Sequence, residues 1–321
     1  MLLEQVLKTK DLRVPQGVFG FSFLSWQGNV TSFEKSQWLS TTLIVVAFLV
    51  LISFFFFRNN LMHFYQRKER TVLKSFQFFS VFILFLTLFR IIILAVGNYP
   101  NLWELIPLHF CRMFIVIMCS SLLFKNVKVI KHIGFFAILG SIFGLLLTDL
   151  KNSDFWMEKG GVSIGYDSYI FWDFLIIHIS SLLIPGYFLT VNQFEYSKKD
   201  VALTAVSLTI FTVVIFGLDW AFTRIGDPKW NANWFYLAPN EFNSVHEMLS
   251  AIVGPLASWP FTLFLFIALG MILYTLCFII YFWLNKFHFI LDKEAKKIRL
   301  IKEKALLWKY FKESSLFTQK A

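Results

Sequence analysis

Seven separate stretches of about 20 apolar residues constrain this chain more than any other feature of its sequence. As a helix, a stretch of that length matches the roughly 30 Å hydrocarbon core of a bilayer. With 57% hydrophobic and 16% charged residues, the chain also lies outside the composition of ordinary soluble domains. The sequence therefore predicts an all-α fold, a polytopic membrane helix bundle of about seven transmembrane helices. The predicted spans are Trp38–Phe57, Ser75–Val96, Trp103–Phe124, Ile130–Thr148, Tyr169–Val191, Val201–Trp220 and Pro260–Trp283.

Lysine and arginine are distributed unevenly between the two sides of this bundle. With the N-terminus outside, 20 of the 30 residues of these two types fall in cytoplasmic segments and eight in outer ones. Such an excess on one side is typical of the cytoplasmic face of membrane proteins. We therefore expect a multi-pass protein of the cell membrane. Its parts are an extracytoplasmic N-tail (1–37), a seven-helix domain (38–284) and a basic cytoplasmic tail (285–321).

The basic tail carries ten lysines and arginines, which account for much of the net charge of +10. Cations that follow the last span indicate anionic lipid as a partner, and no nucleic acid is expected. From Lys286 to Lys312 the tail alternates cationic and apolar residues, which we interpret as an amphipathic helix. That helix either lies on the inner membrane face or is solvated. Outside, the aromatic density of Thr223 to Ser258 predicts a segment that dips into the membrane interface.

Polar side chains inside the spans fall in one layer. With a rise of 1.5 Å per residue, they lie roughly 6–14 Å from the outer membrane boundary. Ionisable groups inside a membrane are costly, so each is a candidate for a functional site. The inner half of the bundle is almost wholly apolar. The members of the layer are Arg90, His109, Cys111, Arg112, Asp173 and His178, with Glu104, Thr148, Asp149 and Asp219 nearer the rim.

A cysteine and a histidine of this layer form a candidate catalytic pair. On a regular helix His109 and Cys111 lie about 200° apart, so a base for Cys111 has to come from another helix. His178 is the other histidine at this depth. A thiol becomes a nucleophile when a nearby histidine or cation stabilises the thiolate. Pro107 removes one backbone hydrogen bond and is expected to kink the third span just above Cys111.

Each of these residues also has a structural interpretation. A lone cysteine in a membrane helix is commonly a packing residue, as we expect for Cys119 and Cys277. Arg90 and Arg112 either neutralise Asp173 and Glu104 or hold a substrate headgroup. A metal site built from His109, Cys111, His178 and Asp173 has no spaced ligand motif in its favour. We therefore expect neither a metal nor a cofactor.

Several segments resemble one family of bacterial integral membrane proteins, the YwaF-like family. Ile106 to Cys111 is similar to its L-P-L-H-L-C signature, and His178 stands where its fifth helix carries a histidine. Gly134 to Leu150 resembles its glycine-rich fourth helix, and Asn231 to Pro239 its outer-loop motif. The chain departs from the family pattern in three places: it has Thr148 in place of proline, Ile179 in place of glycine, and Leu256-Ala257-Ser258 inserted within a G-P-W-P element. These departures leave the shape of the pocket open.

The resemblance implies a seven-helix fold with a polar pocket open to the outer leaflet. A distant eukaryotic relative of that family is a multispanning cysteine acyltransferase that makes ether phospholipids. By that analogy Cys111 is an acyl-accepting nucleophile and His178 its base. Membrane phospholipid is then the substrate. Substrate-binding candidates are Arg90, His109, Arg112, Asp173, Asn231 and Asn233, with the two asparagines or the backbone freed by Pro107 as oxyanion donors.

A second hypothesis from a different class uses the same layer without chemistry. In it the chain is a transporter or a receptor subunit that binds an anionic or lipidic ligand. The apolar inner half argues against a path through the membrane, since transporters usually place polar groups at the midplane and beyond. Replacement of Cys111 by serine separates the two hypotheses, because binding survives it and thioester chemistry does not. The sequence leaves the substrate and the oligomeric state open.

Overall fold

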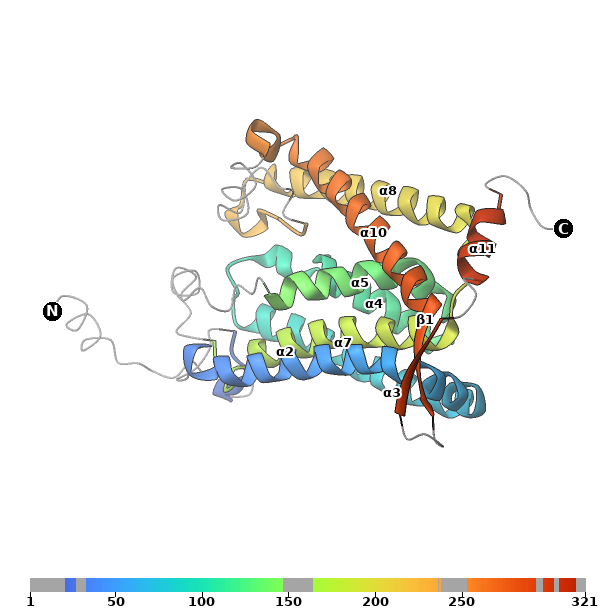
Figure 1. Ribbon diagram of the computed structural model, residues 1–321. Coiled ribbons are helices and arrows are strands. Elements are labelled where there is room, and N and C mark those ends of the chain that lie inside the picture. The colour runs from blue at the N-terminus through green and yellow to red at the C-terminus, as the bar shows by residue number, and fades with distance from the viewer. Residues whose placement is uncertain are drawn as a thin grey trace.

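The computed structural model describes residues 21–26, 33–146, 164–235, 237, 253–292, 297–302 and 306–315 (Figure 1). Within them, seven helices are long and apolar enough to cross a membrane. This result confirms the predicted helical membrane bundle. The spanning elements are α2 (Phe33–Phe56), α3 (Arg58–Val96), η3 (Leu102–Leu105) with α4 (Phe110–Leu123), α5 (Lys128–Leu146), α7 (Tyr169–Asn192), α8 (Lys198–Thr223) and α10 (Thr262–Lys286).

Helix α7 lies at the centre of the bundle. Two thirds of its most apolar window is buried, whereas the corresponding share is 11% for both α2 and α10. Helices α2, α3, α4 and α5 all pack against α7, and α5 makes the most extensive of these contacts. Helices α8 and α10 pack on each other and on α5, and they form the edge of the bundle in Figure 1. The polar groups of α7 are therefore enclosed by protein rather than by lipid.

Helix α3 is much longer than a membrane span. Its 39 residues extend about 58 Å at 1.5 Å per residue, roughly twice the hydrocarbon thickness. The backbone leaves helical geometry at Lys68, with φ −127° and ψ 22°. The segment 58–74, predicted as a cytoplasmic loop, is therefore a helical extension that continues past the membrane boundary after a kink.

The basic tail folds differently from the prediction of one helix. Strands β1 (Phe287–Asp292) and β2 (Lys297–Lys302) form an antiparallel hairpin in which Phe287 pairs with Lys302, and only α11 (Leu306–Glu313) is helical. The segment K-I-R-L-I-K alternates cationic and apolar residues with a period close to two, which fits a strand better than a helix. The helical interpretation of Lys286 to Lys312 was therefore wrong for Phe287–Asp292 and for Lys297–Lys302. The hairpin is the one departure from the all-α prediction among the described residues.

The end of the bundle that is predicted to face outside carries short helical turns: η2 (Ser22–Leu24), η3, η5 (Pro228–Trp230) and η6 (Gly254–Ala257). Trp26, just after η2, is 3% exposed, and its indole N–H donates to the carbonyl of Gly97 at 2.6 Å. In the loop after α8, Trp234 and Phe235 are 1% exposed. The aromatic part of that loop therefore packs into the protein. Tyr236 and Phe242 lie outside the described residues.

Candidate active site at the broken third span

The third span is discontinuous at the depth of the polar layer. The turn η3 ends at Leu105, and the backbone is extended at Ile106. A tight turn at Pro107 follows, in which the Leu108 N–H donates to the Ile106 carbonyl at 2.8 Å. Helix α4 begins at Phe110 with His109 as its N-cap at φ −52° and ψ 135°. Its 14 residues extend only about 21 Å, so α4 begins inside the roughly 30 Å hydrocarbon layer. Irregular backbone at such depth occurs where it is enclosed by protein. The sequence predicted a kink at Pro107, and the structure instead has a complete break.

Cys111 consequently sits in the first turn of α4 rather than in the middle of a helix. The first helical hydrogen bond runs from the Met113 N–H to the His109 carbonyl at 2.8 Å. The N–H groups of residues 110–112 therefore have no carbonyl of their own helix to bond, as at every helix N-terminus. Such an end favours negative charge on a neighbouring sulfur or oxygen.

The Cys111 thiol faces α5. A methyl group placed on Gly140 would lie 3.1 Å from Cys111 Sγ and 2.6 Å from a ring carbon of Phe110. The sulfur therefore packs directly on the bare backbone of α5, in the interior of the bundle. A larger residue at position 140 would displace it.

His178 on α7 approaches the same helix. Its Nδ1 lies 2.7 Å from the carbonyl oxygen of Phe174, which can only accept, so Nδ1 carries the proton. Nε2 is then the unprotonated nitrogen of the neutral ring. A methyl group placed on Gly144 would lie 2.4 Å from that Nε2 atom. The basic nitrogen of His178 therefore points at Gly144.

Gly140 and Gly144 place the two side chains against the same helix. Residues four apart occupy one face of a helix, with Cβ positions about 5–6 Å from each other. Cys111 and His178, which come from different helices, thus lie on neighbouring turns of one glycine face of α5. The Cys111–His178 pair stays a prediction, since this geometry places both side chains against α5 and shows no hydrogen bond between them.

The two arginines of the layer form a network with two carboxylates. Arg112 donates from both terminal nitrogens to Asp173, at 3.2 and 2.5 Å. Arg90 bridges Asp173 at 3.5 Å and Glu104 at 3.0 Å, and it also donates to the Glu104 main-chain carbonyl at 2.8 Å. Two positive and two negative groups leave the network neutral. The network joins α3, η3, α4 and α7, and its Arg112 is the residue next to Cys111. These contacts fit the structural role that was considered for the two arginines, in which they neutralise Asp173 and Glu104.

Tyr99 completes this network at the outer end. Its hydroxyl donates to Glu104 Oε1 at 2.8 Å, and the ring is 3% exposed. Burial first, and the Glu104 carboxylate second, raise the pKa of Tyr99 well above its usual value. The phenol therefore stays protonated and donates to Glu104. Neither Tyr99 nor its role was predicted from the sequence.

His109 and the outer loop lie over the break. The imidazole of His109 packs 5.3 Å from the ring of Trp103, within electrostatic range of Arg90, Arg112, Glu104 and His178. Trp234 donates its indole N–H to the Trp103 carbonyl at 3.1 Å. His109 therefore lies at the candidate site, covered by Trp103 and Trp234, which we call the Trp103–Trp234 lid.

The remaining predicted residues are less closely tied to the thiol. Asn231 and Asn233 flank the buried Ala232 in the chain that leads to Trp234 and are partly exposed. They lie in the loop over the break, and no oxyanion role for them follows from their placement. Thr148 and Asp149 lie outside the described residues. No group of three or more His, Cys, Asp or Glu suited to a metal ion occurs within the described ranges.

Sequence reasoning missed the residues that shape the site. Gly140 and Gly144 carried a readable signal, because two glycines four residues apart in a membrane helix mark a close helix contact. Trp234 was predicted only as part of the interfacial outer loop, and Trp103 only as the first residue of a span. Their mutual contact, at 6.1 Å between ring centroids, depends on a loop that the sequence could not position.

Comparison with known proteins gives one match. The model of the TMEM164 family matches residues 32–281, which include six of the seven spanning helices, most of α10 and both candidate catalytic residues. No curated protein and no solved structure matches the chain.

Proposed function

Because the chain belongs to the TMEM164 family, whose match covers six of its seven apolar helices and most of the seventh, we propose that it is a phospholipid transacylase of the cell membrane. In this proposal Cys111 is the nucleophile and His178 is the base. The observation that carries the proposal is the glycine face of α5, on which the thiol and the unprotonated Nε2 lie one helical turn apart. The proposal also includes the resemblance to the YwaF-like family and, through it, the distant relationship to a cysteine acyltransferase.

In the first half-reaction the Cys111 thiol passes its proton to Nε2 of His178. The resulting thiolate attacks the ester carbonyl of a phospholipid, and a carbon–sulfur bond forms. When the tetrahedral intermediate collapses, the ester carbon–oxygen bond breaks. The lysophospholipid leaves with the proton from His178, and the acyl chain remains as a thioester on Cys111.

In the second half-reaction a lysolipid or another alcohol takes the acyl chain. Its hydroxyl proton passes to His178 while its oxygen attacks the thioester carbonyl. The carbon–sulfur bond then breaks, and the thiolate regains the proton from His178. Both tetrahedral intermediates carry an oxyanion, and the N–H groups in the first turn of α4 are suitable donors for it.

The ion network acts as a positioning element in this mechanism. Arg90 and Arg112 are already paired with Glu104 and Asp173, so we assign them to holding the broken span rather than to a phosphate. The same neutrality weighs against the alternative function, a carrier or receptor for an anionic solute. His109 and the Trp103–Trp234 lid cover the break from the outside.

A covalent adduct tests the proposal. Purified protein incubated with a phospholipid that carries a labelled acyl chain is expected to retain label that hydroxylamine removes. Cys111→Ala and Cys111→Ser abolish the adduct, whereas Cys119→Ala retains it. His178→Gln slows its formation by about 10²–10⁴-fold, the usual contribution of a general base. If wild-type protein forms no adduct while it still binds lipid, the acyl-transfer mechanism is wrong and the binding function replaces it.

A further inference from the structure

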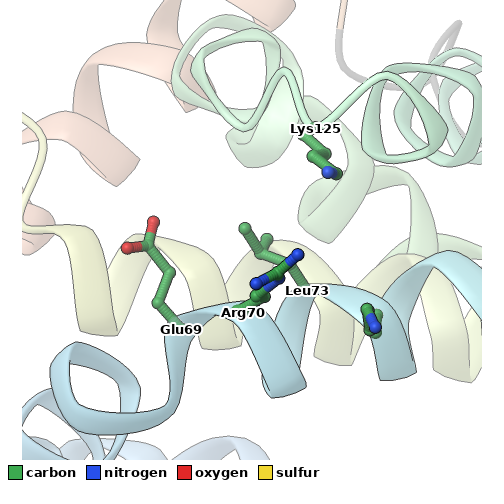
Figure 2. Close-up of a pocket in the computed structure, with 5 residues that line it drawn as sticks. Glu69, Arg70, Leu73 and Lys125 are labelled. Atoms are coloured by element: carbon green, nitrogen blue, oxygen red, sulfur yellow. The ribbon is translucent and has the colours of Figure 1, made fainter.

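A cavity of about 160 Å³ lies at the opposite end of the bundle from Cys111 (Figure 2). It is lined by one turn of α3 and by the residue that follows the end of α4. The positive-inside bias assigns this end to the cytoplasm. The lining residues are Glu69, Arg70, Leu73, Lys74 and Lys125.

Three cations converge on this cavity. Arg70 and Lys74 are four residues apart on α3, where like charges repel each other. In Figure 2 Lys125 points toward α3 from the opposite wall. None of the three forms an ion pair with any residue that the structure describes. The one lining carboxylate, Glu69, accepts a hydrogen bond from Tyr65 at 3.4 Å, one turn back along α3.

The backbone holds Lys125 in a conformation that lysine rarely adopts. Its φ is +58°, in the left-handed region that glycine usually occupies at the end of a helix. Two hydrogen bonds fix this turn, from the Lys125 N–H to Leu122 at 2.9 Å and from the Asn126 N–H to Ser121 at 2.8 Å. Gln77 on α3 also donates to the Leu123 carbonyl at 2.8 Å. The wall that carries Lys125 is therefore tied to the wall that carries Arg70.

The surroundings of the cavity indicate a membrane lipid. Phe78 follows Lys74 by one helical turn and is 80% exposed, and Phe124 precedes Lys125 and is 84% exposed. Exposed rings of this kind are compatible with contact to lipid acyl chains. Because the three cations lie next to these rings, they lie at the edge of the apolar surface, which is the depth of the phosphate groups in a bilayer.

From this arrangement we propose that the cavity binds the phosphate group of an anionic phospholipid in the cytoplasmic leaflet. Arg70 and Lys125 contact the phosphate from opposite walls, Lys74 neutralises further charge, and Phe78 and Phe124 pack along the acyl chains. Its volume of about 160 Å³ leaves room for a phosphate ester. This site is separate from the acyl-transfer site and from the predicted lipid contact of the tail.

Native mass spectrometry of the full chain in non-ionic detergent tests the site. The probes are phosphatidylglycerol, phosphatidylcholine with the same acyl chains, and inorganic phosphate. We expect wild-type protein to bind phosphatidylglycerol in preference to phosphatidylcholine. The variant Arg70→Gln/Lys74→Gln/Lys125→Gln weakens that binding by about tenfold or more. The single variant Arg70→Gln, which perturbs folding least, gives a smaller loss in the same direction.

The matched control removes the same charge from exposed residues that lie outside both the cavity and the tail, as Arg67→Gln/Lys128→Gln/Lys199→Gln, and retains the wild-type affinity. Equal loss in the control and in the cavity variant would mean general charge attraction and would overturn the proposal. Binding of inorganic phosphate as tight as that of phosphatidylglycerol would overturn the assignment to a lipid. Because the readout is lipid bound rather than acyl transferred, its result is independent of the proposed chemistry at Cys111.

Discussion

Arg112 on α4 and Asp173 on α7 form a two-pronged ion pair within the first turn of α4 after the break in the third span. The carboxylate of Asp173 is 3% exposed and also receives Arg90 at 3.5 Å. Both partners are thus removed from water, and each depends on the other for compensation of its charge. The pair joins the helix that carries Cys111 to the helix that carries His178.

Replacement of Asp173 by asparagine is expected to lower stability by about 3–5 kcal/mol, because it leaves Arg112 with an uncompensated buried charge. The double variant Arg112→Met/Asp173→Leu removes both charges and leaves Arg90 paired with Glu104, so it should recover part of this loss. Thermal denaturation in detergent measures both variants. A double variant no more stable than Asp173→Asn would contradict the pairwise account.

Gly144→Ala is expected to abolish acyl-adduct formation, because the added methyl group would lie 2.4 Å from Nε2 of His178 and displaces the ring. Gly270→Ala on α10 is the matched control, since a methyl group there meets no atom within 4 Å. The adduct assay measures both. Full activity in Gly144→Ala would show that the position of His178 does not matter for the chemistry.

Asp219 on α8 anchors the loop over the site, and its two oxygens differ in their contacts. Oδ1 accepts the Trp234 N–H at 3.0 Å, while Oδ2 is buried without a partner among the described residues. Asp219→Asn keeps an acceptor and removes the charge, so stability should stay level or rise. Asp219→Leu leaves the Trp234 amide unpaired and should cost about 1–3 kcal/mol. Thermal unfolding checks the order, and equal losses in both variants would exclude this anchor.

Asp200 caps α8 at the opposite end of the bundle. It exchanges hydrogen bonds with Ser197 as a capping box, and it pairs with Lys131 on α5 at 2.9 Å. Asp200→Ala should cost about 1–2 kcal/mol through loss of the cap, with a small further loss from the partly buried ion pair. Lys131→Met removes the ion pair and the cation–π contact of Lys131 with the Tyr196 ring, but it leaves the cap intact. Its loss in thermal stability should therefore be the smaller of the two, and the reverse order would contradict the capping role.

The seven spans could be predicted because each is a long apolar run, and hydrocarbon thickness fixes the length that such a run needs. The break before α4 could not, since Pro107 disturbs a helix without dictating whether the chain bends or restarts. The sequence identified Asp173 and Glu104 as partners for the arginines. Which carboxylate meets Arg112 depends on the packing of α4 against α7.

The tail and the outer loop show the same limit. Alternation of charged and apolar residues in 297–302 is compatible with a strand or with one face of a helix, and pairing with β1 decides for the strand. Likewise, the aromatic residues of the outer loop indicated contact with apolar surroundings, either lipid or protein. The hydrogen bonds of Trp234 with Asp219 and Trp103 show that Trp234 packs into the protein.

The Arg112–Asp173 pair also sets an order for biogenesis. An arginine within a span costs about 2.5–3.5 kcal/mol on insertion, and its partner lies 61 residues later in the chain. A nascent chain that ends before α7 therefore holds Arg112 in the bilayer without its main counter-charge. The third span becomes fully accommodated only after the fifth has left the translocon, so early release of the ribosome would yield a fragment prone to degradation.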